Sequence, residues 1–411
     1  MTTRIYILGG YQTDYARNWT RDGMELFDLF SNTVDAGLES TSLDPSSIET
    51  AHVGNFTAEL FCGQGHLGGF FAACRPEFSG IPASRHEGAC ASGSLAILAA
   101  SAEIEAGRYD ISAVIGVEMM CNVSGAEAAK NIGGTAMWNG HECIDVQYPW
   151  PHMFSELGDE YDRRYGLKQE HLARIAEINF ANAKRNPNSQ TRKWQFTEDS
   201  FLENDQANPV IEGRIRKQDC GQITDGAAIV FLASAKRAKE YAVHQGISLD
   251  SIPYIKGWGH STAPIAYQDK IDASQGENFV FPHLRQSIED SFARAGIRDV
   301  DALDGIETHD CFTTTEYMAI DHFGITAPGE SWKAIEAGDI EMGGRIPINP
   351  SGGLIGLGHP VGATGVRMAL DCYKQTTGQA GDYQVENASN FATLNVGGSA
   401  TTSVSFVVGT A

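Results

Sequence analysis

The chain has 411 residues, of which 42% are hydrophobic and 20% charged, as in folded proteins with room for two or three sizeable cores. Its 52 acidic and 30 basic residues give a net charge of −22, which argues against proteins that bind nucleic acid or anionic membranes through basic patches. No apolar run approaches the roughly 20 residues of a membrane span. The eight cysteines form no Cys-x-x-Cys pair, so we expect neither a disulfide framework nor a metal site, and a cytoplasmic location.

The first part of the chain alternates between strand and helix patterns. Residues 1–10 read as a first strand that runs into a glycine turn, with no signal peptide. Short apolar runs predict strands at 5–8, 52–54, 111–117 and 228–232, and amphipathic or small-residue patterns predict helices at 23–38 and 92–106. This alternation predicts a largely parallel sheet that is covered by helices on both faces.

A candidate nucleophile lies in the stretch 85–94. Cys90 falls just before the predicted helix 92–106, which stops at Gly107. Unpaired N–H groups at a helix N-terminus stabilise a thiolate and lower the pKa of the thiol. Cys90 is therefore a candidate for covalent catalysis, although a free cysteine is about as often a small buried hydrophobe.

The stretch 121–221 differs in composition, since it is richer in polar residues, aromatics and prolines, and its pattern predicts one amphipathic helix at 166–185. The buried-strand pattern resumes at 225–232. We therefore interpret 121–221 as a unit inserted into a first α/β half that comprises residues 1–120 and 222–250.

The remaining residues, 251–411, repeat the order of the first half. Ile306-Glu307-Thr308 echoes Ile48-Glu49-Thr50, and each triplet is followed by a glycine-rich turn and a small-residue helix, at 90–106 and at 359–373. Each half then closes on an apolar strand, the second at 403–408. This repetition predicts a duplication in which both glycine-rich turns meet at the centre of the molecule.

Two further segments carry titratable side chains. His359 lies in the glycine-rich stretch 349–365, where the backbone can approach a ligand and the imidazole can take a proton from a thiol. His309 and Cys311 follow a predicted strand, at the edge where open α/β sheets bind ligands. In isolation, a cysteine beside Phe312 is more often a core residue.

These segments together resemble the thiolase family, and within it the sterol-carrier-protein type. The motifs are Gly-Ala-Cys-Ala-Ser-Gly at 88–93, His-Asp-Cys-Phe at 309–312, Asn-Pro-Ser-Gly-Gly at 349–353 and the glycine-rich run at 358–365. The resemblance implies an acyltransferase with two duplicated βαβαβαββ halves in a five-layer α-β-α-β-α arrangement and an inserted loop domain. It implies a reaction that makes or cleaves the C–C bond of a 3-ketoacyl thioester.

The resemblance also implies roles for individual residues. Cys90 accepts the acyl group, His359 activates it, His309 serves the oxyanion hole, and Cys311 moves the proton at the substrate's α-carbon. The C-terminal segment 390–399 departs from the family pattern, since it contains Asn395 but neither cysteine nor histidine. The backbone N–H groups of the turn at Gly397 and Gly398 are further candidate oxyanion donors.

The implied substrate is a coenzyme A thioester, with no permanently bound cofactor, and the implied assembly is a homodimer or a dimer of dimers, with a role in lipid metabolism. Basic residues of the inserted unit are candidates for its phosphates: Arg163, Arg164, Lys168, Arg214, Arg216 and Lys217. Two alternatives remain open, namely acyl transfer without coenzyme A and a thiolase-like partner subunit with little activity of its own. A ketoacyl synthase is disfavoured by the motifs around His309 and His359.

Overall fold

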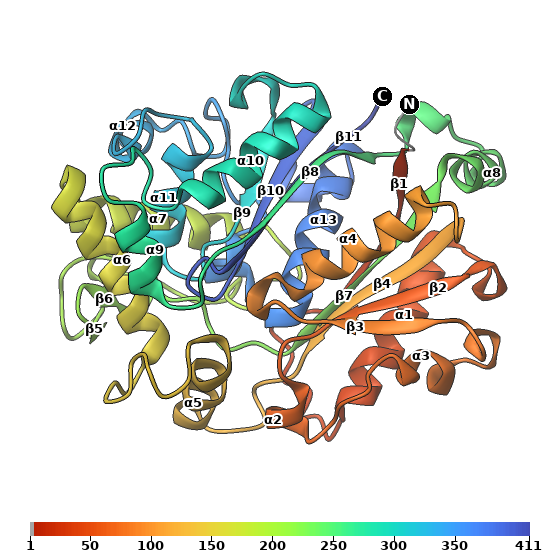
Figure 1. Ribbon diagram of the computed structural model, residues 1–411, viewed down its shortest axis with the longest axis horizontal. Coiled ribbons are helices and arrows are strands. Elements are labelled where there is room, and N and C mark those ends of the chain that lie inside the picture. Colours follow the sequence, from red (N-terminus) through yellow and green to blue (C-terminus); the bar gives the residue numbers. More distant parts are fainter. Residues whose placement is uncertain (1–3) are drawn as a thin grey trace.

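The computed structural model describes residues 4–411, so the first three residues of the strand predicted at 1–10 lie outside it. Its centre is a nine-stranded sheet in the order β3-β2-β4-β7-β1-β8-β11-β10-β9 (Figure 1). The strands are β1 (Ile5–Gln12), β2 (Thr50–Gly54), β3 (Ala83–His86), β4 (Ile111–Glu118), β7 (Gly226–Ser234), β8 (Tyr254–Thr262), β9 (Gly305–Thr308), β10 (Asn390–Gly397) and β11 (Thr402–Gly409).

Helices surround and separate the strands. They are α1 (Leu26–Thr41), α2 (Ala58–Cys62), α3 (Gly69–Cys74), α4 (Ser92–Glu105), α5 (Gly125–Ala136), α6 (Pro149–Tyr165), α7 (Gln169–Ala183), α8 (Ala235–Gln245), α9 (Tyr267–Ala273), α10 (Pro282–Ala295), α11 (Thr313–His322), α12 (Ser331–Ala337) and α13 (Thr364–Thr376). In the part of the chain that the structure describes, none of them combines the length and apolarity needed to cross a membrane.

The prediction of a largely parallel sheet is wrong. Only the contacts β2–β3, β2–β4 and β9–β10 are parallel, and the other contacts within the nine-stranded sheet are antiparallel. The reason is visible in the last two strands. A turn of four residues joins β10 to β11, which is far too short for the crossover that a parallel pair requires. A strand that is buried on both faces is a continuous apolar run in a parallel sheet and in an antiparallel sheet, so the sequence does not distinguish the two.

The two halves repeat one strand order. The first half reads β3-β2-β4-β7-β1 from its edge, and the second reads β9-β10-β11-β8. Beyond β9, Ile348 forms a parallel bridge with Ile306 and stands where β3 stands in the first half. The halves join where β1 pairs antiparallel with β8 through Ile5 and Tyr6. The duplication predicted from the repeated triplets is therefore present in the topology.

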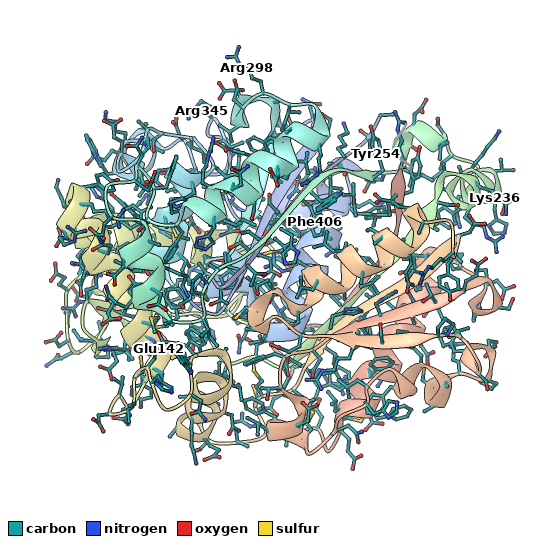
Figure 2. The ribbon with its side chains drawn as sticks, in the orientation of Figure 1. Glu142, Lys236, Tyr254, Arg298, Arg345 and Phe406 are labelled. Atoms are coloured by element: carbon teal, nitrogen blue, oxygen red, sulfur yellow. The ribbon has the colours of Figure 1, made fainter. Side chains whose placement is uncertain are left out.

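The two central helices, α4 and α13, pack against strands of the sheet and against each other (Figure 1). They share one buried cluster with β1, β7 and β11, in which Phe406 of β11 lies inside the molecule (Figure 2). Helices α1, α3 and α8 cover the first half from outside, and α10 covers β8 and β11. The result is the five-layer α/β arrangement expected from the motifs.

The glycine-rich turns meet at the centre because they lack side chains. A Cβ atom at Gly93 would lie 2.8 Å from the carbonyl oxygen of Gly362, and one at Gly54 would lie 2.5 Å from the Cα of Gly93. A methyl carbon cannot lie that close to a non-bonded atom in a packed core. The absence of these methyl groups therefore brings the N-terminal ends of α4 and α13 together.

Residues 121–221 contribute α5, α6, α7 and a small hairpin of β5 (Val210–Glu212) and β6 (Ile215–Arg216). Helices α6 and α7 pack on α11 of the second half and share its hydrophobic core. The amphipathic helix predicted at 166–185 is present as α7, with Leu172 and Ile175 buried. The limits that we assign to the inserted unit and to the two halves stay a prediction.

Candidate active site

Cys90 lies on a tight turn that leads into α4. Residues Ala89–Ala91 form a single 3₁₀ turn, and Ala89 has a φ of 51°, in the left-handed region that residues with a side chain rarely adopt. The hydroxyl of Ser92 donates to the Ala89 carbonyl at 2.6 Å and accepts from the Gly88 N–H at 3.0 Å. The turn is thus held in a costly conformation, as is common at functional sites.

The predicted low pKa of Cys90 is not found. Burial raises the pKa of the Cys90 thiol to about 12, and the N–H of Gly398, which donates to the sulfur, lowers it only in part. The helix N-terminus is present as expected, but desolvation of a thiolate in an apolar enclosure outweighs it. The resting residue is therefore a neutral thiol, and a base must take its proton during attack.

His359 is placed to be that base. Its Nδ1 lies 2.6 Å from the hydroxyl oxygen of Thr364, and this hydroxyl donates to the carbonyl of Pro360 at 3.2 Å. The base role requires the tautomer in which Nδ1–H of His359 donates to Thr364 and the Thr364 hydroxyl donates to Pro360, since Nε2 then has a free lone pair. Burial, and then the charge of Arg367, lowers the pKa of His359 to about 3, so the imidazole is neutral.

Three predicted residues come together in space. The sulfur of Cys90 and one ring nitrogen each of His309 and His359 all lie within 4.8 Å of one another. The two imidazole rings meet edge to face, with centroids 5.3 Å apart and an interplanar angle of 84°. Both histidines are more than 200 residues away from Cys90 in the sequence, and the duplicated fold brings them next to it.

Asn395 ties this cluster together. Its Nδ2 donates to the carbonyl of Cys90 at 3.0 Å and lies 3.3 Å from Nδ1 of His309, and its Oδ1 accepts from the hydroxyl of Ser94 at 2.9 Å. Because Nδ2 has only protons to offer, Nδ1 of His309 is the acceptor and the ring proton is on Nε2. Burial holds the pKa of His309 well below its usual range, so His309 is a neutral N–H donor.

Cys311 lies beside the cluster. It is buried at the start of the segment that leads into α11, and its carbonyl accepts from the N–H of Gly221 at 2.8 Å. Burial raises the pKa of the Cys311 thiol well above its usual range, and the neighbouring Cys90 adds to this effect. Cys311 is therefore a protonated thiol that can donate a proton close to the nucleophile.

One cavity of about 290 Å³ contains the reactive groups. Cys90, Cys311, His359 and Gly398 are among the residues that line it. Its walls are mostly apolar and come from α5, α6 and the segments around 220 and 312: Met120, Ala126, Ala129, Ile132, Tyr148, Trp150, Phe154, Ile223, Phe312 and Val361. The inserted unit thus supplies much of the enclosure in which a thioester would react away from bulk water.

The two glycines of the C-terminal turn have different positions. Gly398 faces the cavity, and its N–H donates to the sulfur of Cys90. Gly397 is paired with Thr402 inside the β10–β11 ladder. A Cβ atom at Gly397 would lie 2.0 Å from the carbonyl oxygen of Gly88, so this glycine allows the turn to approach the Cys90 segment.

Buried carboxylates position the site from behind, and the sequence reasoning did not identify them. Glu118 accepts from the backbone N–H groups of Phe56, Thr57 and Gly362, and burial raises its pKa to about 7. Asp310 accepts from the N–H groups of Leu354 and Ile355 in the glycine-rich stretch. The sequence signal for them was an acidic residue next to apolar residues, because a carboxyl group is rarely buried unless it has hydrogen-bond partners.

The arginines expected to contact coenzyme A do not line the cavity. Arg163 and Arg164 both donate to Glu160, and Arg214 forms ion pairs with Asp159 and Asp162. Arg216 is likewise engaged, with Asp205. The geometry gives all four local partners, and their role in substrate binding stays a prediction.

Among residues 4–411, two groups of side chains have a spacing that could hold a metal ion. One is the Cys90, His309 and His359 cluster, and the other is Glu170, His171 and Glu336 at the contact of α7 with α12. In the second group, His171 Nε2 lies 3.0 Å from a carboxylate oxygen of Glu336, while Nδ1 of His171 is buried without a hydrogen-bond partner among the described residues. In the first, the same three donors are arranged as a nucleophile, a base and a hydrogen-bond donor.

Comparison with known proteins agrees with this geometry. The family model described as "Thiolase, N-terminal domain" matches residues 5–236, and the one described as "Thiolase C-terminal domain-like" matches residues 266–410. The chain belongs to the thiolase family. It is therefore an acyltransferase of the thiolase type, and the resemblance inferred from the sequence motifs is confirmed.

Similar proteins cover nearly all of this thiolase. It is 30% identical over 394 residues to an acetyl-CoA acetyltransferase of Methanothermobacter thermautotrophicus, with 96% of each chain aligned. It is 27% identical to human sterol carrier protein 2, over 96% of this chain and 70% of the relative. Among solved structures, an Ltp2–ChsH2(DUF35) aldolase matches with a TM-score of 0.76 at 19% identity, and covers 99% of this chain and 98% of its own.

Proposed function

We propose that this thiolase transfers an acyl group between a coenzyme A thioester and a carbon or sulfur nucleophile through an acyl-enzyme at Cys90. The observation that carries the proposal is the convergence of Cys90, His359 and His309 within 4.8 Å, with Cys90 and His359 lining an apolar cavity. Acyl transfer needs a nucleophile, a base and donors for the developing oxyanion, and this cluster offers one of each.

In the first half-reaction, Nε2 of His359 takes the thiol proton as the sulfur of Cys90 attacks the carbonyl carbon. The new C–S bond forms while the carbonyl oxygen gains negative charge. The N–H of Gly398 and the Nε2–H of His309 are the donors available to that oxygen. As the tetrahedral intermediate collapses, the bond to the leaving group breaks, and the imidazolium of His359 returns the proton to it.

Cys311 handles the proton at carbon. In the cleavage direction, Cys90 attacks the 3-keto carbon of a 3-ketoacyl thioester, the bond between carbons 2 and 3 breaks, and the thiol of Cys311 protonates carbon 2 of the departing acetyl thioester, which leaves Cys311 as a thiolate and His359 as an imidazolium. In the second half-reaction, the thiol of coenzyme A gives its proton to Cys311 and attacks the acylated Cys90, and His359 returns its proton to the departing sulfur of Cys90. The condensing direction is the reverse. The raised pKa of Cys311 fits an acid that stays protonated until the C–C bond breaks.

The relatives and the cavity support a coenzyme A thioester as the substrate. The acetyltransferase relative is named for acetyl-CoA, and a human mitochondrial 3-ketoacyl-CoA thiolase of the same fold, with a TM-score of 0.69 at 12% identity, has been solved in complex with coenzyme A. The apolar walls around Cys90 are suited to the acyl part of such a thioester. No permanently bound cofactor is needed for these steps.

The test is mass spectrometry of the intact protein after incubation with acetyl-CoA and, separately, with acetoacetyl-CoA. We expect a mass increase of one acetyl group that is absent in Cys90→Ala. A second measurement separates acyl transfer that needs coenzyme A from transfer that does not, because a small thioester such as acetyl-N-acetylcysteamine lacks the nucleotide. Absence of an acetyl adduct with every donor would contradict the proposal.

A second candidate function is that of a subunit that works with other chains. The aldolase of similar fold is named as an assembly with a DUF35 protein, which motivates the proposal of a partner subunit here. Strand β3 at the edge of the sheet leaves one side without a strand partner among residues 4–411, which suits pairing with a second copy in a homodimer. Light scattering of the purified chain tests the dimer, and full turnover by that chain alone would exclude a need for a partner.

A further inference from the structure

The turn that joins β10 to β11 contains Gly398 and has an unfavourable conformation. Gly398 and Ala400 have φ angles of 62° and 64°, in the left-handed region, which is costly for alanine because it has a side chain. The N–H of Gly398 donates to the sulfur of Cys90, and Ala400 is 1% exposed. Such a conformation persists only where the surrounding residues hold it. The residues that hold this turn therefore set the position of a group that contacts the nucleophile.

His283 of α10 binds the turn at Ala400. Its Nε2 lies 2.8 Å from the carbonyl oxygen of Ala400. Since a carbonyl oxygen only accepts, the ring proton is on Nε2. Burial lowers the pKa of His283 to about 4, so the imidazole is neutral at neutral pH. His283 is not among the residues that line the reactive cavity, and it acts on the backbone of the turn alone.

Lys270 of α9 binds the turn at the next residue, Thr401. Its Nζ donates to Oγ1 of Thr401 at 3.2 Å, and to the carbonyl oxygens of Pro264 and Ile265 at 2.8 and 3.0 Å. Lys270 is 3% exposed, and burial lowers the pKa of its ammonium group to about 8. At neutral pH it therefore has three protons for three acceptors. A buried ammonium group is costly without such partners, so it ties the turn to the segment after β8.

The inserted unit also packs against this turn. A Cβ atom at Gly398 would lie 3.1 Å from the carbonyl oxygen of Ala136, the last residue of α5. Glu142, in the segment after α5 (Figure 2), accepts from the N–H of Tyr267 at the start of α9 at 2.7 Å, and its charge opposes the effect of burial on the pKa of Lys270. The turn therefore has little room on the side of α5, and its position depends on its anchors.

We propose that Lys270 and His283 are positioning residues, which hold the turn 398–401 so that the N–H of Gly398 faces the oxygen of the reacting thioester. Neither side chain contacts the substrate. A hydrogen-bond donor stabilises a developing oxyanion only at a precise position, and a shift of about 1 Å can lower the rate by about 10²-fold. The inference rests on the proposed function, since Gly398 acts on the oxyanion of the same acyl transfer.

The test uses variants that break one contact with the turn and conservative variants that keep it. Thr401→Val removes the hydroxyl that accepts from Lys270, and His283→Leu removes the donor to Ala400. Each should slow single-turnover acylation of Cys90 by acetyl-CoA about tenfold, and both together about 10²-fold. The acetyl-CoA concentration that gives half the maximal rate should not change, because the N–H acts on charge that develops during the reaction. Thr401→Ser and His283→Gln keep an oxygen and an N–H, and should restore most of the rate.

Alkylation of Cys90 by iodoacetamide, followed by mass spectrometry of its peptide, gives a second measurement. The N–H of Gly398 lowers the pKa of the Cys90 thiol, so a displaced turn should slow alkylation at constant pH about tenfold. A loss of stability alone would not have this effect. Thr33→Val is the matched control, because that buried hydroxyl donates to the carbonyl of Leu29 within α1, on the outside of the first half. It should leave both rates unchanged.

A double-mutant cycle assigns the effect of Thr401 to Lys270. Lys270→Met/Thr401→Val should be no slower than Lys270→Met alone, because both changes remove the same contact. Additive effects would overturn the role of Lys270. The proposal as a whole is overturned if folded Thr401→Val and His283→Leu acylate at the wild-type rate, if the conservative variants are equally slow, or if Cys90 alkylation is normal in the slow variants. Failure of the proposed function is distinct, since the wild-type protein would then form no acetyl-enzyme.

Discussion

Replacing Asn395 with Asp tests the hydrogen-bond logic of the site with almost no change of shape. Aspartate keeps the oxygen that accepts from Ser94 but replaces Nδ2, the donor to the Cys90 carbonyl and to Nδ1 of His309, with a second acceptor. His309 must then place its proton on Nδ1. Its Nε2 loses the proton that faces the developing oxyanion.

The expected cost follows from the number of donors. In the wild-type protein, the Nε2–H of His309 and the N–H of Gly398 are the two donors that we assign to the oxyanion. Removing one oxyanion donor typically lowers the rate by about 10²–10³-fold. We therefore expect acylation of Cys90 in Asn395→Asp to be slower by about that factor. The new carboxylate also favours a doubly protonated His309, which would regain its Nε2–H, so the deficit should shrink below about pH 6.

The assay is single-turnover acylation by acetyl-CoA, quenched and read by intact mass, across a range from about pH 5.5 to 8. Ser94→Ala is the matched control, because it removes one hydrogen bond of Asn395 but leaves the proton of His309 in place, and it should slow acylation only severalfold. Thermal unfolding establishes that both variants are folded. The reasoning is refuted if Asn395→Asp acylates at the wild-type rate, or if its deficit is equal at every pH.

Three further outcomes are expected. Cys311→Ala should still form the acetyl-enzyme from acetyl-CoA but lose most C–C cleavage, because only cleavage requires an acid that protonates carbon. Normal turnover of acetoacetyl-CoA by this variant would show that another group is the acid. Gly93→Ala should lower the free energy of unfolding by about 1–3 kcal/mol, since its Cβ would meet the Gly362 oxygen at 2.8 Å. Gly134→Ala, inside α5 and without a positive φ, is the matched control, because a Cβ there meets nothing within 4 Å and the variant should lose no stability. Burial raises the pKa of Glu118 to about 7, above the value near 4.3 in the unfolded chain. Its contribution to the free energy of unfolding therefore falls as the pH rises from about 4 to 7. In Glu118→Gln, denaturant titrations should show a free energy of unfolding that depends less on pH over this range, and an unchanged pH dependence would mean that this carboxyl is not buried in the protonated form.

The sequence alone determined the local features of this protein. Glycine next to small residues, followed by good helix formers, placed Cys90 directly before α4, and that position is found in the structure. The apolar runs predicted β1, β2, β4, β7 and β11, because these strands are almost wholly buried. Strands β3 and β8 are largely half-buried or exposed, and they have no such pattern in the sequence. The sequence motifs also identified the family, because each motif is a short, continuous segment of the chain.

Only the tertiary structure decided the direction of the strands, the protonation of the site and the fate of the arginines. Strand direction depends on connections, which the apolar runs do not encode. The pKa of Cys90 depends on how completely distant elements enclose its sulfur, and this desolvation overrides the local effect of the helix terminus. The proton on each histidine is set by Thr364 for His359 and by Asn395 for His309, and Asn395 comes from a different strand and from the far end of the chain. Such contacts exist only after the chain has folded, so no reading of neighbouring residues could supply them.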